Sequence, residues 1–236
     1  MNTNPFKTFS KKEKILWVVS LLVVGISNIV SGYLSGTSGN GGFLNLIAAL
    51  LGVTAVLLCA KGHVWGQILI AIFSLLYGVI SFQFHYYGEM ITYMGMCFPM
   101  AIWSLYTWIK HPSEQNEEEV KIDFLSMKVK LLLLLCGVVV TVVFYGILSF
   151  FNTPNLIFST ISITTSFFAA ALTGLRSSYY AFWYALNDMV LIILWVLASV
   201  VYPGYVPLVV NFVVFLVNDS YGFYSWKKRE NAQQQM

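Results

Sequence analysis

The chain has 236 residues, of which 58% are hydrophobic, 17% aromatic and only 10% charged, and its formal net charge is +3. A soluble domain carries about 25% charged residues, so this chain has too little polar surface for a globular cytoplasmic enzyme or a disordered segment. The composition therefore predicts a helical protein that crosses a membrane several times.

Eight apolar stretches approach the length of about 20 residues that a helix needs to cross a bilayer core of about 30 Å. We expect an all-α membrane protein with these stretches as transmembrane helices, at residues 15–36, 43–60, 64–85, 90–109, 129–151, 156–175, 180–201 and 207–226. The first stretch follows a basic segment, as a signal peptide would. It is longer than a usual signal-peptide core, which favours a retained helix.

The positive charges indicate the orientation of these helices. With the N-terminus inside, all 13 Lys and Arg residues fall on the cytoplasmic side, and the outer loops hold none. This is a strong positive-inside pattern. It predicts a multi-pass protein of the plasma membrane with both termini in the cytoplasm.

The second half of the chain repeats the aromatic pattern of the first half at an offset of 118 residues, without gaps. The pairs are Trp65–Trp183, Tyr77–Trp195, Tyr87–Tyr205, Trp103–Tyr221, Tyr106–Tyr224 and Trp108–Trp226. Aromatic residues also recur at helix ends because they favour the membrane interface. A single offset across these pairs favours a duplication, with two parallel three-helix bundles joined by a linker helix.

This duplication divides the chain into five parts. We expect a basic tail with an N-terminal helix (1–42), a first three-helix bundle (43–110), a cytoplasmic loop with a linker helix (111–155), a second three-helix bundle (156–228) and a cytoplasmic tail (229–236). Parallel repeats of this kind occur in transporters.

Two Asn-Asp pairs interrupt the apolar helices of the second bundle: Asn187-Asp188 in the seventh stretch and Asn218-Asp219 in the eighth. Ionisable groups inside a membrane are costly, and they mark functional sites by default. Each Asp lies about eight residues, or about 12 Å, from the cytoplasmic end of its helix, so the two carboxyl groups are expected at similar depth. The alternative is that these residues only bond neighbouring helices to each other.

The residues around these acids suit a flat polar ring. Trp183 and Asn187 are expected on one helix face, because they are four residues apart. A Trp ring stacks on a heterocycle while an amide bonds its polar edge, and Trp together with Asp favours a cation. Neither a catalytic or nucleotide-binding motif nor a metal-ligand spacing occurs in the sequence, so we predict no enzyme activity, no metal and no cofactor.

Two segments of the second half, WYALNDMVLIILW (183–195) and FLVNDSYGFYSWKK (215–228), resemble the PnuC-type vitamin transporters, whose best-known members carry nicotinamide riboside. The stretch from Trp65 to Trp108 is similar to the first repeat of that family. The resemblance implies a SWEET-like fold with an extra N-terminal helix and a substrate bound between the bundles. The implied substrate-binding residues are Trp183, Asn187, Asn218, Tyr221, Gln83 and Trp65. From their position inside the membrane, we expect Asp188 and Asp219 to act as gate or electrostatic residues.

The resemblance also implies a mechanism: facilitated diffusion of nicotinamide riboside into the cell without a coupling ion, followed by trapping through a separate cytoplasmic kinase. A homo-oligomer, as large as a trimer, is the implied assembly. Relatives in this family carry thiamine, riboflavin or deoxynucleosides, and the sequence does not separate these substrates. Two other classes of function stay open: a vitamin-binding subunit of an energised transporter, and an intramembrane enzyme that acts through the Asp pair.

Overall fold

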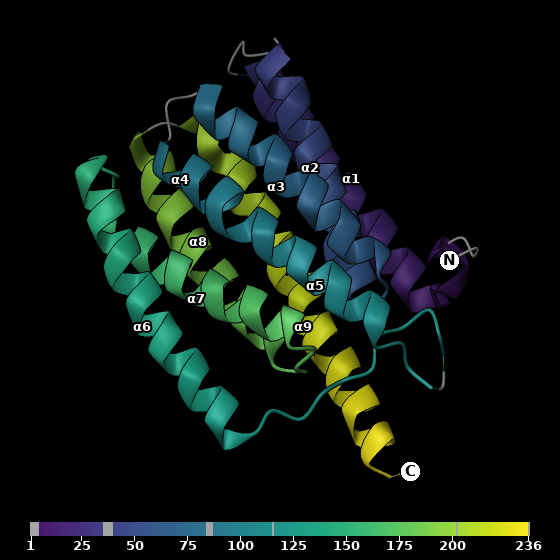
Figure 1. Ribbon diagram of the computed structural model, residues 1–236. Coiled ribbons are helices and arrows are strands. Elements are labelled where there is room, and N and C mark those ends of the chain that lie inside the picture. Colours follow the sequence, from purple (N-terminus) through teal and green to yellow (C-terminus); the bar gives the residue numbers. More distant parts are fainter. Residues whose placement is uncertain (1–4, 35–39, 84–86, 115, 202, 236) are drawn as a thin grey trace.

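The computed structural model describes residues 5–34, 40–83, 87–114, 116–201 and 203–235, and these residues form helices joined by short connections (Figure 1). Seven of the described helices are long and apolar enough to cross a membrane. They are α1 (Lys11–Leu34), α2 (Asn40–Ala60), α3 (Trp65–Gln83), α6 (Met127–Phe150), α7 (Leu156–Gly174), α8 (Tyr180–Val201) and α9 (Val206–Gln234).

The eighth expected span consists of three shorter helical pieces in succession. These are α4 (Tyr87–Thr92), a π-helical turn (Tyr93–Cys97) and α5 (Phe98–Lys110). Pro99 explains the wide turn, because it has no N–H group for the carbonyl four residues before it. With this span included, the prediction of an all-α membrane protein with about eight spans is confirmed.

The helices form two groups of three. The helices α2, α3 and α5 pack together, and α7, α8 and α9 pack together in the same way. The two groups meet through α2 against α9 and through α5 against α7, so the two contacts between bundles are equivalent. Of the remaining spans, α1 packs on α2 and α9, and α6 packs on α7 (Figure 1).

The turns after α2 and α7 have the same backbone. Gly62 and Arg176 are both left-handed, with φ angles of 71° and 57°. The N–H of Gly62 donates to the carbonyl of Cys59, and the N–H of Arg176 donates to the carbonyl of Thr173. Equivalent residues in these turns are therefore 114 apart in the sequence.

The ungapped offset of 118 is thus wrong for α2 and α3, so Trp65 and Trp183 are not equivalent. The offset does relate Trp108 at the end of α5 to Trp226 in α9. The discrepancy of four residues is close to one helical turn of 3.6 residues. Three of these four residues lie in α8, which has 22 residues where α3 has 19. An added turn shifts the numbering but leaves the same helix face toward the partner bundle.

Both termini lie at one end of the molecule, which we call the terminal end (Figure 1). Trp108 and Trp226 are fully buried near this end, with ring centroids 5.6 Å apart. The indole N–H of Trp108 donates to the carbonyl of Thr173 in α7, and that of Trp226 donates to the carbonyl of Cys59 in α2, both at 2.9 Å. Each bond joins one bundle to the other, so the terminal end is closed.

The connection between α5 and α6 runs across this closed end. Arg229 of α9 donates to the carbonyl of Val120 at 2.6 Å and forms an ion pair with Glu119 at 3.0 Å. Asp123 forms an ion pair with Arg176 in the turn after α7, at 2.8 Å. The N–H of Val120 donates to the carbonyl of Gly62 in the turn after α2 at 2.9 Å, so the connection is attached to both bundles.

The first helix is bonded along its length to the second bundle. The contacts between α1 and α9 are Glu13 Oε1 with Tyr221 Oη (2.6 Å), Ser20 Oγ with Asn218 Nδ2 (3.1 Å) and Asn28 Nδ2 with Asn211 Oδ1 (3.2 Å). The indole of Trp17 also donates to Thr54 of α2 at 3.1 Å. The helix α1 therefore bridges the contact between the two bundles.

Candidate functional site

A cavity of about 200 Å³ lies between the two bundles. A cavity needs about 10–15 Å³ of such volume to hold one water, so this cavity has room for more than about ten waters or for a small organic molecule. Its walls come from α2, α3, the π-helical turn and α5 of the first bundle and from α7, α8 and α9 of the second. Toward the terminal end it reaches Cys59 and Thr173, the residues whose carbonyls the two tryptophans bind.

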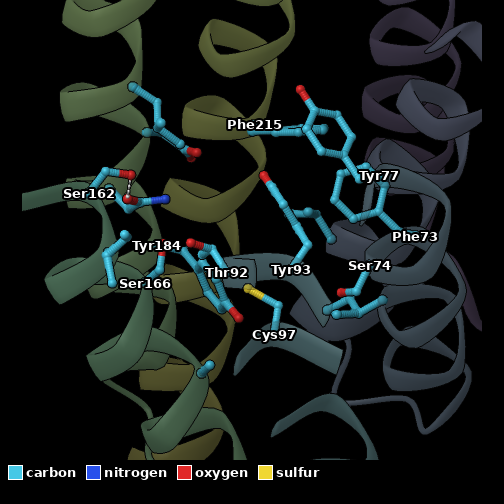
Figure 2. A pocket seen from close by; sticks show the side chains of 18 of the residues that line it. Phe73, Ser74, Tyr77, Thr92, Tyr93, Cys97, Ser162, Ser166, Tyr184 and Phe215 are labelled. Atoms are coloured by element: carbon cyan, nitrogen blue, oxygen red, sulfur yellow. Dashed lines mark hydrogen bonds between the residues drawn. The ribbon is translucent and has the colours of Figure 1, made fainter. Parts of the chain in front are cut away.

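One side of the cavity is aromatic (Figure 2). The rings of Phe73 and Tyr77 on α3 and of Tyr93 in the π-helical turn pack with centroids 4.6–6.0 Å apart. Phe215 of α9 lies beside them in Figure 2 and lines the same cavity. Such a wall offers π faces to a flat or positively charged ring.

The opposite side is polar, with Ser162 and Ser166 of α7 facing the aromatic wall (Figure 2). The hydroxyls of Ser162 and Thr165 both donate to Oδ1 of Asn187, each at 2.9 Å. These bonds fix the orientation of the buried amide. Within the described part of the chain, the Nδ2 group of Asn187 makes no hydrogen bond, so it is available to donate to a ligand in the cavity.

Asp188 of α8 and Asp219 of α9 also line the cavity, with only 4% and 5% of their surface exposed. Their carboxyl groups are close enough to interact with each other. Among the described residues of the cavity wall there is no Lys, Arg or His. The side chains of the cavity wall are therefore either acidic or uncharged.

The two bundles contribute equivalent positions to this wall. At an offset of 114 the lining pairs are Gly52–Ser166, Val56–Ala170, Cys59–Thr173, Ile70–Tyr184, Phe73–Asn187, Ser74–Asp188 and Tyr77–Leu191, and at 118 they are Cys97–Phe215 and Ala101–Asp219. The cavity thus lies where the two repeats meet. The first bundle fills the paired positions mainly with apolar and aromatic side chains, whereas the second fills them with the amide of Asn187 and both acids.

Three of the predicted site residues come together in the cavity: Asn187, Asp188 and Asp219. Asn218 and Tyr221, which were also expected there, instead point toward α1. Asn218 bonds Ser20 and Tyr221 bonds Glu13, as described above. Polar residues occur on both faces of α9, so the sequence does not tell the face that packs on α1 from the face that lines the cavity.

Trp183 and Trp65 do not line the cavity either. Trp183 packs on Phe168 of α7 with ring centroids 4.6 Å apart. Four residues turn a helix by about 40° beyond a full turn, which takes Trp183 from the cavity edge at Asn187 toward α7. Trp65 is 39% exposed at the start of α3. The side chain of Gln83 lies outside the described residues.

Sequence reasoning missed the serine stripe of α7 and the aromatic residues Phe73, Tyr93 and Phe215. The stripe has a detectable signal, because Ser159, Ser162, Ser166 and Thr173 recur at helical spacing on one face. The aromatic wall has no comparable signal, because Phe and Tyr residues occur on every face of these helices.

Three comparisons with known proteins agree. The family model described as nicotinamide mononucleotide transporter matches residues 42–228. A nicotinamide riboside transporter PnuC from Neisseria mucosa is 28% identical over 191 residues, which cover 79% of this chain and 72% of the relative. A crystal structure of the vitamin B3 transporter PnuC covers 93% of this chain and 92% of its own, with 27% sequence identity and a TM-score of 0.74. The chain therefore belongs to the nicotinamide mononucleotide transporter family of multi-pass membrane proteins.

Proposed function

We propose that this protein carries nicotinamide riboside across the plasma membrane by facilitated diffusion. The observation that carries the proposal is the cavity between the bundles, with an aromatic wall facing the fixed amide of Asn187. Nicotinamide riboside has a flat, positively charged ring with a carboxamide and a ribose. The ring suits the aromatic wall, the carboxamide oxygen suits the Nδ2 group of Asn187, and the ribose hydroxyls suit Ser162 and Ser166.

The charge of the cavity favours the riboside over the mononucleotide. The mononucleotide adds a phosphate with a charge of about −2 at neutral pH. The described cavity wall holds two carboxyl groups and no basic side chain that would bind a phosphate. Thiamine, riboflavin and deoxynucleosides remain the alternative substrates, and of these thiamine shares the positive charge.

In the proposed mechanism, the bundles at residues 43–110 and 156–228 rock against each other and expose the cavity to one side at a time. Residues 1–42, 111–155 and 229–236 flank or connect these units. The terminal end faces the cytoplasm, in line with its positive charges. No coupling ion takes part, and a cytoplasmic kinase traps the product by phosphorylating it. The assembly is a homo-oligomer, as large as a trimer.

The test is transport by the purified chain in liposomes, without any ion gradient. We expect labelled nicotinamide riboside to equilibrate across the membrane, and excess unlabelled riboside, but not the mononucleotide, riboflavin or thiamine, to block it. A protein that binds the riboside but needs a second complex for flux would be the binding subunit of an energised transporter. Recovery of chemically altered substrate would favour an intramembrane enzyme.

Two matched variants connect this transport to the cavity. Asn187→Ala removes the amide that faces the cavity, and we expect it to abolish binding while the protein still inserts into the membrane. Asn211→Ala removes a second buried amide of the bundle, which bonds Asn28 of α1 and does not line the cavity. It should bind the riboside as the unaltered protein does. Wild-type affinity in Asn187→Ala would refute the assignment of this cavity.

A further inference from the structure

Asp188 and Asp219 are two buried acids without a positive partner. Two neighbouring carboxyl groups can share one proton, and the pair then carries one negative charge. The ion pairs among the described residues all lie at the terminal end, on helix ends and connections, and none includes these acids. A buried charge without compensation costs several kcal/mol. The pair therefore holds this negative charge only when a positive charge enters the cavity.

Unpaired polar atoms along the cavity wall also indicate a ligand. Asp188 Oδ2, the hydroxyl of Tyr180 and the indole N–H of Trp195 have no hydrogen-bond partner among the described residues. All three residues line the cavity, and they are 4%, 1% and 8% exposed, respectively. Because about 90% or more of buried polar groups in proteins are hydrogen-bonded, three unpaired groups around one cavity indicate a site built for an occupant.

The titratable neighbours of the pair do not supply a positive charge. Cys59 of α2 and Tyr180 and Tyr184 of α8 interact electrostatically with Asp219, and Cys97 of the π-helical turn faces Tyr184. Thiols and phenols of this kind are ordinarily uncharged near pH 7. Asp188 and Asp219 are therefore the only residues of the described cavity wall that can hold a formal charge near pH 7.

We propose that Asp188 and Asp219 together form the charge-recognition site of the cavity, which carries one negative charge when it is occupied and selects a ring with one positive charge over a neutral ring of the same shape. This inference rests on the proposed function, because it assigns the residues that recognise the charged ring of the substrate. Asn187 and the aromatic wall recognise the shape and the carboxamide, which a neutral analogue shares. Charge and shape are thus recognised by different residues.

The experiment compares two ligands that differ in charge. Nicotinamide riboside has a positive ring, and its reduced 1,4-dihydro form has a neutral ring of nearly the same shape. Binding of each to the purified full chain is measured by titration calorimetry. We expect the unaltered protein to bind the positive form at least about tenfold more tightly, a factor that corresponds to about 1.4 kcal/mol.

Variants of the pair give a sharper expectation. Asn resembles a protonated Asp, so Asp188→Asn and Asp219→Asn each leave one negative charge, and each should keep the preference for the positive ring. The double variant leaves no charge and should bind both forms with affinities within about twofold of each other. Its binding of the neutral form shows that the cavity is still folded. Glu114→Gln, on an exposed connection paired with Lys121, is the charge-matched control and should change neither affinity.

Each outcome supports or overturns the inference. Equal affinity of the unaltered protein for both forms, or a double variant that keeps the preference, would overturn the charge-recognition site while nicotinamide riboside remained the substrate. Loss of the preference in either single variant would overturn the assignment of one shared charge. Failure of the unaltered protein to bind either form would overturn the proposed function itself.

Discussion

Replacement of Trp226 by Phe tests whether the two tryptophans hold the terminal end closed. Phe keeps most of the ring but removes the N–H group that donates to the carbonyl of Cys59 at 2.9 Å. That carbonyl also accepts a bond from Gly62, so it does not become an unsatisfied buried group. The loss is therefore the net value of one hydrogen bond, about 0.5–1.5 kcal/mol.

This loss shifts the balance between closed and open states if the bond exists only when the terminal end is closed. A change of about 0.5–1.5 kcal/mol corresponds to a two- to thirteenfold larger open population. Trp108→Phe should have the same effect, because Trp108 makes the equivalent bond to Thr173, whose carbonyl likewise has a second donor, Arg176. Two equal effects from different bundles would be a consequence of the repeat.

Cys59 provides the assay, because it lines the cavity directly behind the tryptophans. The other two cysteines, Cys97 and Cys136, are replaced by Ser, and a membrane-impermeant thiol reagent is added at the cytoplasmic face of inside-out vesicles. We expect alkylation two to thirteen times faster in either Phe variant, in proportion to the open population. Trp103→Phe is the control, because the indole of Trp103 makes no hydrogen bond among the described residues and is 39% exposed. Unchanged rates in both Phe variants, or an equal rise in the control, would refute the reasoning.

Three further predictions concern stability, measured as thermal unfolding in detergent. Glu13→Gln weakens the bond that Tyr221 donates to a buried carboxylate at 2.6 Å, and should cost about 1–3 kcal/mol while riboside affinity stays within about twofold. Gly66→Ala would place a Cβ atom 2.7 Å from a backbone nitrogen of α2 and should cost about 1–3 kcal/mol or more, whereas Gly146→Ala, with open space around it, should be neutral or stabilising. Burial lowers the pKa of His63 below its ordinary 6.5, although nearby glutamates oppose the shift. The fold therefore favours the neutral ring, and this contribution to stability is fully present above pH 6.5. It is lost as the pH falls through the lower pKa of the folded state. His63→Asn should remove that loss, and an unchanged pH profile would contradict this account.

The sequence predicts the helices of this protein well because the bilayer imposes their length and composition. The π-helical turn before Pro99 is the exception within the described spans. A proline inside a membrane helix produces a kink, a widened turn or a new helix start, depending on its neighbours. The repeat is also recognisable in the sequence, but its register is not, because a whole added turn in α8 leaves the aromatic pattern nearly in phase.

The candidate site was predictable only where polarity is rare. Asn187, Asp188 and Asp219 stand out because amides and acids are costly in a membrane, whatever they contact. Whether such a residue faces a cavity or a neighbouring helix depends on packing, and Asn218 next to Asp219 faces α1 instead. Trp183 illustrates the same limit. Its spacing from Asn187 predicts that both residues lie on one helix face, but it does not predict that the cavity is too narrow to include both.

The bonds between α1 and α9 join a span that is synthesised early with one that is synthesised much later. Glu13, Ser20 and Asn28 have their partners at Tyr221, Asn218 and Asn211, about 180–210 residues later in the chain. During synthesis these three polar groups remain without their partners, in the membrane or in the insertion machinery, until α9 has been inserted. The contact between α1 and its bundle therefore forms only after α9 has been synthesised, and chains that stop before α9 should be recognised by the cell as incomplete.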